Sequence, residues 1–292
     1  MPFATINGIR INYLIQGSGP HLLMFAPGGF WSVMANWTAH SGKNAWQQMD
    51  ALTTLARHFT VIAYDRRESG SSGGRVEPLS WDLYVREALG LLDLAQAKQA
   101  YILGGCMGAS LVTAFAVRHP ERCIGLIPHW PVGGYQWMMK GRTFFDRHIA
   151  FVRANGLAAA VTRAQQGNNH FWSDPESGPW ATTIKADPAF AAQYVKQDVE
   201  RYLDILKQSR DAIFNDTMPS GASGAELLQI RIPALIISGA DTVHTVSAAW
   251  ALKELMPQSE RWDVLPPHQN GQNTLEQILR FKARLESTVQ AA

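Results

Sequence analysis

The feature that most constrains the fold is a buried strand that turns directly into a helix. The run Tyr101-Ile-Leu-Gly104 is typical of a buried strand, and Ala109 to Arg118 has a helical pattern. Gly104-Gly105-Cys106-Met107-Gly108 joins them. Glycines two residues before and after Cys106 leave room where side chains would clash with the adjoining helix and strand. The segment therefore predicts a tight turn with Cys106 in a strained conformation at its tip.

Strand and helix patterns alternate on both sides of this turn. Asn7-Gly8 separates two short strands, 3–6 and 9–15, and is a strong hairpin signal. Further strands are predicted at 22–26, 60–64, 124–127, 232–237 and 262–265, and helices at 46–58, 80–95 and 274–288, with Ser80 as the cap of the second. The alternation predicts an α/β fold with a mostly parallel sheet and the hairpin as its antiparallel edge.

The alternation stops for about 95 residues after the strand that ends near Pro128. Helical patterns at 141–155, 157–166 and 187–214 fill this stretch, with a polar break at 167–188. We therefore predict a core domain made of residues 1–130 and 226–292, interrupted by a helical cap, or lid, at 131–225.

Charge and cysteine content exclude several classes of protein. The net charge of the 292 residues is +2 and basic residues are scattered, so neither nucleic acid nor a membrane surface is expected as a partner. Two cysteines are too few for a disulfide framework, and the N-terminus lacks a signal-peptide pattern, which favours a cytoplasmic protein. Metal-ligand spacings and phosphate-binding loops are missing, so no metal and no cofactor are expected. Whether the protein forms a homodimer is left open by the sequence.

With these motifs the chain resembles the α/β-hydrolase superfamily along essentially its whole length. The turn at Cys106 resembles the G-x-S-x-G nucleophile elbow with cysteine in place of serine, and Asp65 to Ser71 resembles the D-x-R-G-x-G-x-S segment with Glu68 replacing a usual glycine. Ala26 to Gly29 takes the place of the H-G-G loop. The resemblance implies the same fold, with the insertion as the family's cap.

The resemblance also implies a catalytic triad in the order nucleophile, acid, histidine. After Cys106 the chain offers Asp241, which follows the strand at 232–237, and then His268, which follows the strand at 262–265. Asp241 lies one position short of the usual place of the acid and is chosen partly by elimination. For the oxyanion hole we expect the N–H of Met107 and that of Gly28, with Gly29 as the alternative.

Aromatic residues and histidines near these segments are candidates for a substrate pocket. Trp130, Trp137, Trp172 and Trp180 fall in one stretch of the chain and fit either an aromatic pocket wall or simple core filling. The predicted pocket residues are Phe30, Trp31, His129, Trp130, Trp137, Trp172 and His244.

A cysteine nucleophile indicates the kind of reaction. A thiolate is a strong nucleophile and a good leaving group, which suits activated carbonyls such as esters, lactones and thioesters. The expected function is hydrolysis of a small aromatic or otherwise apolar acyl substrate through a thioester on Cys106. Acyl transfer through the same thioester and a non-catalytic, ligand-binding member of the fold are the alternatives.

Overall fold

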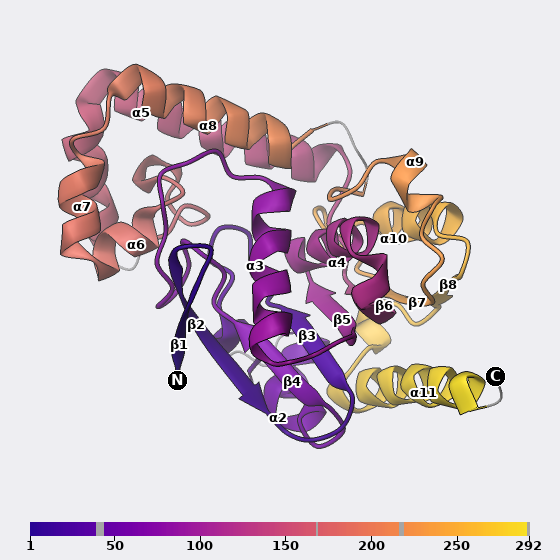
Figure 1. Ribbon diagram of the computed structural model, residues 1–292. Coiled ribbons are helices and arrows are strands. Elements are labelled where there is room, and N and C mark those ends of the chain that lie inside the picture. Colours follow the sequence, from indigo (N-terminus) through magenta and orange to yellow (C-terminus); the bar gives the residue numbers. More distant parts are fainter. Residues whose placement is uncertain (39–43, 168, 216–218, 291–292) are drawn as a thin grey trace.

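A central sheet of eight strands organises the part of the chain that the computed structural model describes, residues 1–38, 44–167, 169–215 and 219–290 (Figure 1). In spatial order the strands are β1 (Phe3–Ile6), β2 (Ile9–Gln16), β4 (Thr60–Tyr64), β3 (His21–Phe25), β5 (Ala100–Gly105), β6 (Cys123–His129), β7 (Ala234–Ile237) and β8 (Ser259–Trp262). From β4 to β8 all neighbours are parallel, whereas β1 with β2 and β2 with β4 are antiparallel. The predicted fold class is confirmed.

The strands form where the sequence predicts them because their side chains are buried on both faces of the sheet. All six residues of β5 and the last four of β3 and β4 are buried. In the N-terminal hairpin both turn residues, Asn7 and Gly8, have positive φ, as a two-residue hairpin turn requires. The last strand was misplaced, because β8 ends at Trp262, where the predicted strand begins.

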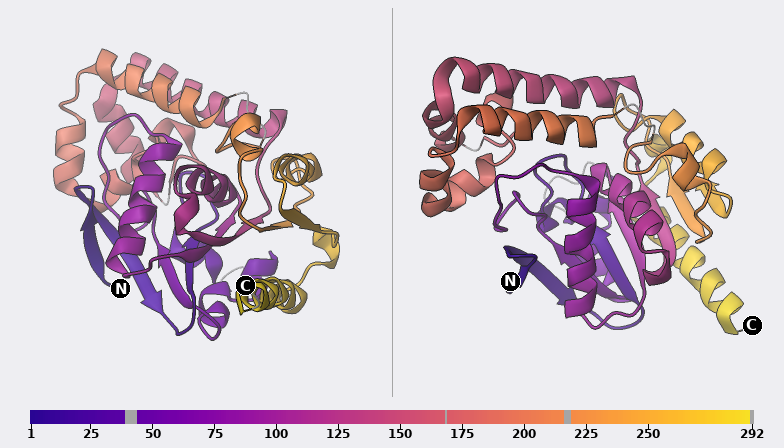
Figure 2. Two further views of the ribbon diagram at one scale, coloured as in Figure 1. Left: turned by 45° about the vertical axis from the view of Figure 1, so that its right-hand side comes forward. Right: turned by 45° about the horizontal axis from the view of Figure 1, so that its top comes forward.

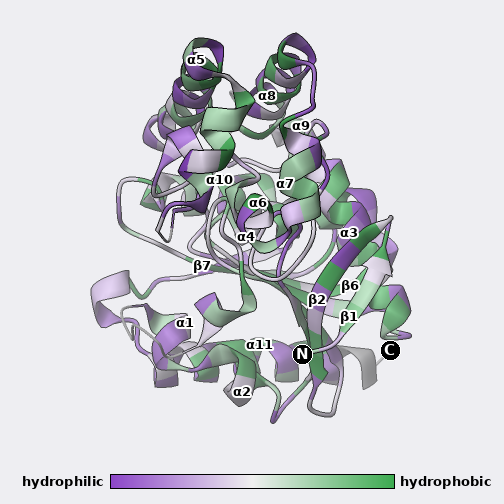
Figure 3. Ribbon diagram, turned by 90° about the vertical axis from the view of Figure 1, so that its left-hand side faces the viewer, coloured by the Kyte–Doolittle hydropathy of each residue, from purple (hydrophilic) through white to green (hydrophobic). Residues whose placement is uncertain are grey.

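Helices cover both faces of the sheet. The helices α3 (Trp81–Leu94), α4 (Met107–Arg118) and α10 (Val246–Leu255) pack on one face, while α1 (Ala45–Gln48), α2 (Ala51–Leu55) and α11 (Gly271–Gln290) pack on the other. Figure 3 shows the hydrophobic strands between these layers. The predicted cap of α3 is confirmed, since Ser80 Oγ accepts a hydrogen bond from the Leu83 N–H at 3.2 Å. The predicted helix at 46–58 is two short helices, broken at Asp50, which has a left-handed conformation.

The helices between β6 and β7 lie together beyond one end of the sheet (Figure 2). They are α5 (Tyr135–Gln165), α6 (Ala181–Ala186), α7 (Pro188–Tyr194) and α8 (Val199–Ile213), followed by the short α9 (Gly224–Leu227). Helix α5 is interrupted at Gly156, as the two separate helical patterns at 141–155 and 157–166 predict. Aromatic side chains from α5 and α8 and from the segment between α5 and α6 join the hydrophobic core of the sheet, so this layer is packed firmly onto it.

A buried cluster of charges joins α3 to the loop that follows β4. Arg67 contacts the carboxylates of Glu68 at 2.7 Å, Glu77 at 2.6 Å and Glu87 at 3.4 Å. Glu68 has a φ of 61°, which explains why glycine is usual at this position. Burial raises the pKa of Glu87 to about 8, in spite of the opposing charge of Arg67. At Glu87 the cost of burial therefore outweighs the attraction of Arg67 and Arg66.

This cluster predicts a pH-dependent stability that Glu87→Gln removes. A carboxyl whose pKa rises on folding stabilises the protein fully below its unfolded pKa, and this contribution is lost as the pH rises through about 8. The glutamine cannot ionise, and Arg67 keeps Glu68 and Glu77. We expect the melting temperature of the variant to exceed that of the parent by roughly 2–5 °C at pH 8 and to match it at pH 5. If thermal unfolding gave the same difference in melting temperature between variant and parent at both pH values, the prediction would be contradicted.

Candidate active site

Cys106 lies at the junction of β5 and α4, in the tight turn that the sequence predicts. Its backbone has φ 55° and ψ −126°, a conformation that non-glycine residues rarely adopt. A Cβ atom on Gly104 would lie 2.1 Å from the carbonyl oxygen of Gly108, and one on Gly108 would lie 2.3 Å from that of Phe25. The two glycines are therefore required, and they let the strand and the helix hold the thiol at the carboxyl end of the sheet.

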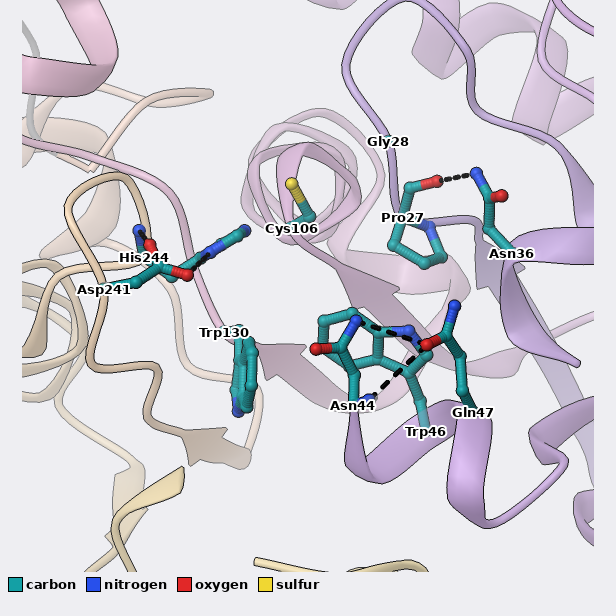
Figure 4. A pocket seen from close by; sticks show the side chains of 10 residues that line it. All are labelled: Pro27, Gly28, Asn36, Asn44, Trp46, Gln47, Cys106, Trp130, Asp241 and His244. Carbon is teal, nitrogen blue, oxygen red and sulfur yellow. Dashed lines mark hydrogen bonds and ion pairs between the residues drawn. The ribbon is translucent and has the colours of Figure 1, made fainter. Parts of the chain in front are cut away.

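His244 and Asp241 lie on the loop between β7 and α10, at the same end of the sheet. The carboxylate of Asp241 folds this loop around itself, because its Oδ1 accepts hydrogen bonds from the backbone N–H groups of Val243 at 2.9 Å and His244 at 2.8 Å. Its Oδ2 lies 2.7 Å from His244 Nδ1. Figure 4 shows the imidazole between Asp241 and Cys106. The loop thus presents one ring nitrogen to the carboxylate and the other toward the thiol.

Nε2 of His244 makes no regular hydrogen bond to the thiol, but the imidazole lies close enough for its charge to act on the sulfur. Burial by itself raises the pKa of the Cys106 thiol, yet the charge of His244 and nearby backbone N–H groups outweigh it, so the pKa lies below its usual value. Burial lowers the pKa of His244, but the thiolate and Asp241 raise it to about 10. The lowered pKa of the thiol and the raised pKa of His244 together favour a thiolate–imidazolium ion pair.

Two backbone N–H groups point at the sulfur. They belong to Met107, the first residue of α4, and to Gly28, in the loop after β3, and both lower the pKa of the thiol. Gly29, the alternative, is not among the backbone donors that lower the pKa of the thiol, and its carbonyl oxygen accepts a hydrogen bond from the guanidinium of Arg66. The arrangement places two donors where negative charge would develop on a substrate bound to Cys106.

A cavity of about 240 Å³ opens beside Cys106 (Figure 4). Its walls combine the catalytic candidates with indole and amide side chains. They are Pro27, Gly28, Asn36, Asn44, Trp46, Gln47, Cys106, Trp130, Asp241 and His244. The sequence did not identify Asn36, Asn44, Trp46 or Gln47, because they lie in a segment without any recognisable motif.

The structure does not bring His268 to Cys106, which corrects the predicted position of the base. His268 is exposed at the end of a 3-10 helix, Pro266–His268, and does not line the cavity. The next residue, Gln269, points inward instead. Its amide donates to the carbonyl oxygens of Ser238 at 2.9 Å and Val264 at 2.7 Å and accepts from Trp130 Nε1 at 2.7 Å. The tight turn at the two prolines therefore directs the glutamine, not the histidine, toward the site.

The pairing of His244 with Asp241 was missed because the resemblance pointed to a later loop for the histidine. The signal in the sequence is the short spacing of Asp241 and His244, three residues apart, which lets a single turn join carboxylate and imidazole. His244 was predicted only as a pocket residue. It does line the cavity, together with Trp130.

The other predicted pocket residues do not reach the cavity. Phe30, Trp137 and Trp172 pack into an aromatic cluster with Phe214, with ring centres 5.2 Å apart between Trp137 and Phe214. The prediction that these residues line an aromatic pocket is therefore corrected. Their rings bury one another, which supports the alternative that they fill the core.

Trp31 and His129 are also away from the cavity. Trp31 stacks on His170 with ring centres 4.8 Å apart, and His129 is fully buried behind Trp46, at 4.9 Å. Burial lowers the pKa of His129 to about 3, so this ring is neutral. His129 thus lies behind the wall of the cavity, whereas the Trp31 side chain is exposed.

Within the described ranges, no cluster of three or more His, Cys, Asp or Glu side chains could hold a metal ion. None of the helices in those ranges has the length and apolar character needed to cross a membrane.

Comparisons with known proteins agree with the fold. The model of the family described as alpha/beta hydrolase fold matches residues 28–268. The uncharacterized hydrolase YraK of Bacillus subtilis (strain 168) is 30% identical over 129 residues, which cover 44% of this chain and 43% of YraK. The 2-hydroxymuconate semialdehyde hydrolase of Pseudomonas sp. (strain CF600) is 30% identical over 122 residues, 41% of this chain and 39% of that enzyme. Each alignment thus spans well under two thirds of the relative.

A solved structure extends the likeness over the whole chain. A mutant of the meta-cleavage product hydrolase CumD from Pseudomonas fluorescens IP01, complexed with acetates, has a TM-score of 0.57 and 19% identity. The match covers 100% of this chain and 98% of that one. At this level of identity the likeness concerns the fold alone.

Proposed function

Because the chain belongs to the α/β-hydrolase fold family, we propose that it is a hydrolase that cleaves an activated acyl bond of a small molecule, with Cys106 as nucleophile and His244 as base. The observation that carries this proposal is the contact of the Cys106 thiol with the His244–Asp241 pair beside a cavity. Hydrolase names among the curated relatives support the reaction class.

In the first step the Cys106 thiolate attacks the acyl carbon and forms a carbon–sulfur bond. The carbonyl electron pair moves to oxygen, where the N–H groups of Gly28 and Met107 hold the oxyanion. The oxyanion then collapses and expels the leaving alkoxide or thiolate, which takes the proton from the imidazolium of His244. The product of this step is a thioester on Cys106.

In the second step neutral His244 takes a proton from water, and the hydroxide attacks the thioester carbon. The same N–H groups hold the second oxyanion, and Cys106 leaves as a thiolate beside the imidazolium of His244. Asp241 holds the ring in one orientation and stabilises its charge throughout. The resting ion pair is thus restored.

The size of the cavity favours a small substrate. Its volume of about 240 Å³ lies below the range of roughly 300–1,000 Å³ that is typical of ligand pockets. The indole rings of Trp46 and Trp130, 5.0 Å apart, offer an apolar wall, in keeping with the predicted aromatic or apolar acyl group. Among the described residues that line the cavity there is neither Lys nor Arg.

The test is a stopped-flow assay with p-nitrophenyl acetate, combined with intact-mass analysis, on the parent and on Cys106→Ala. We expect a burst of one equivalent and an acetyl adduct in the parent, and neither in the variant. An adduct that persists in water but transfers to added alcohols or thiols would favour the acyltransferase alternative. Equal slow rates and no adduct in both proteins would refute the mechanism and favour a ligand-binding protein.

A further inference from the structure

We propose that Asn36 is a positioning residue that sets the oxyanion hole, by fixing the plane of the peptide that joins Pro27 to Gly28. This inference rests on the proposed function, since it assigns a role within the same acylation step. Asn36 lines the cavity but lies on its far side from Cys106, with the Pro27–Gly28 peptide between them (Figure 4).

Asn36 clamps both ends of the loop that carries Gly28. Its Nδ2 donates one hydrogen bond to the carbonyl oxygen of Pro27 at 2.7 Å and another to that of Trp31 at 2.9 Å. Both hydrogens of the amide are thus used inside the loop. A side chain fully engaged with the protein in this way acts on the loop, and its Nδ2 has no further hydrogen for a substrate.

The support under Asn36 is rigid. The residue lies in the 3-10 helix Met34–Trp37, and its own N–H donates to the carbonyl oxygen of Val33 at 3.0 Å. The N–H of Met34 donates at 2.8 Å to the buried carboxylate of Asp65, and Trp37 is fully buried. The clamp therefore connects the loop to the core of the sheet.

The planar trans peptide between Pro27 and Gly28 links the hydrogen bond of Asn36 to the direction of the Gly28 N–H. The C=O of Pro27 and the N–H of Gly28 belong to one planar unit and point in opposite directions. A hydrogen bond that holds the oxygen toward Asn36 must hold the N–H toward the other side, where it meets the sulfur of Cys106. The same bond polarises the peptide and makes the N–H a stronger donor.

This loop needs an external restraint because position 28 must be glycine. Gly28 has a φ of +114°, and a Cβ atom there would lie 2.5 Å from the carbonyl oxygen of Trp31. Glycine tolerates a wide range of φ, so the peptide plane before it can rotate at low cost. Asn36 supplies the restraint that a side chain at position 28 cannot.

The experiment compares Asn36→Leu, which has no donor and a similar volume, with the parent and with Thr38→Val. Thr38 donates a hydrogen bond to the carbonyl oxygen of Ala35 at 2.7 Å in the same turn and does not line the cavity, so its variant controls for local loosening. In the p-nitrophenyl acetate burst we expect Asn36→Leu to lower the acylation rate by about 30- to 100-fold, with KM changed less than about threefold. Thr38→Val should stay within about twofold of the parent.

Two further readouts separate positioning from a structural role. Alkylation of Cys106 by iodoacetamide forms no oxyanion, so its rate at pH 8.5 should fall less than about threefold in Asn36→Leu. At pH 8 the acylation rate of Asn36→Asp should be as low as that of Asn36→Leu. As the pH falls toward 5, its deficit relative to the parent should narrow, because a protonated carboxyl donates to the Pro27 oxygen again.

Equal acylation rates in the parent and a folded Asn36→Leu would overturn the proposal and leave the proposed function standing. Matching losses of acylation, alkylation and melting temperature in both Asn36 variants would also overturn it, in favour of a structural role. A parent that shows neither burst nor adduct would refute the proposed function and this inference together.

Discussion

Replacement of His244 by alanine should lower kcat/KM for p-nitrophenyl acetate by about 10⁴-fold, while replacement of His268 by alanine should leave it within about twofold of the parent. His244 is the imidazole that joins Asp241 and Cys106, and without it the thiol loses its ionic partner and the leaving group loses its proton donor. His268 is exposed and lies outside the cavity, so it has no step to perform.

The pair of variants is a matched comparison, because both remove one imidazole from a loop at the same end of the sheet. Steady-state kinetics and the amplitude of the burst, measured on both, check the prediction. Loss of activity in His268→Ala with retention in His244→Ala would reverse the assignment. It would mean that the loop after β8 rearranges to deliver His268 when substrate binds.

The second large effect concerns the pH at which Cys106 reacts. At pH values between the lowered pKa of the thiol and the pKa of about 10 of His244, the resting state is a thiolate beside an imidazolium. Iodoacetamide should therefore alkylate the parent well below pH 9, the ordinary pKa of a thiol. In His244→Ala the positive charge is gone and only the backbone N–H groups of Gly28 and Met107 oppose burial, so the midpoint of the alkylation profile should move to higher pH and the rate at pH 6 should fall at least 100-fold.

The alkylation profile has an internal control in Cys123. Burial raises the pKa of this second thiol above its usual range, so it should stay unmodified at pH 6 in both proteins. Peptide mapping by mass spectrometry assigns the modified cysteine. A parent profile with its midpoint at pH 9 or higher would contradict the ion pair, and the same profile in parent and variant would show that His244 does not control the thiol.

Local patterns in the sequence were enough for the fold and for the nucleophile candidate. Buried parallel strands need continuous apolar runs, so the strands from β3 to β7 could be predicted within a few residues. The turn at Cys106 depends on contacts within one strand–helix unit, where Gly104 and Gly108 have no room for a side chain. Both features are encoded by neighbours in the chain, which is why a single sequence suffices for them.

Positions that depend on how distant segments meet could not be predicted in this way. The aromatic residues of the insertion fit a pocket wall or a core equally well, and only packing places Trp137 and Trp172 against Phe30 and Phe214. The amide wall of the cavity comes from the loop and helix after β3, which carry no motif, and the role of Asn36 depends on hydrogen bonds to two carbonyl oxygens of another turn.

The sequence by itself determined the α/β architecture, the strained turn at Cys106 and the loop that holds Asp241, because each follows from side-chain volume and periodicity along a short stretch. The tertiary structure decided that His244 meets the thiol and that His268 does not. The direction of a loop side chain depends on the turn that carries it: Asp241 binds the N–H groups of its own loop and draws His244 inward, while the prolines before His268 turn Gln269 inward in its place.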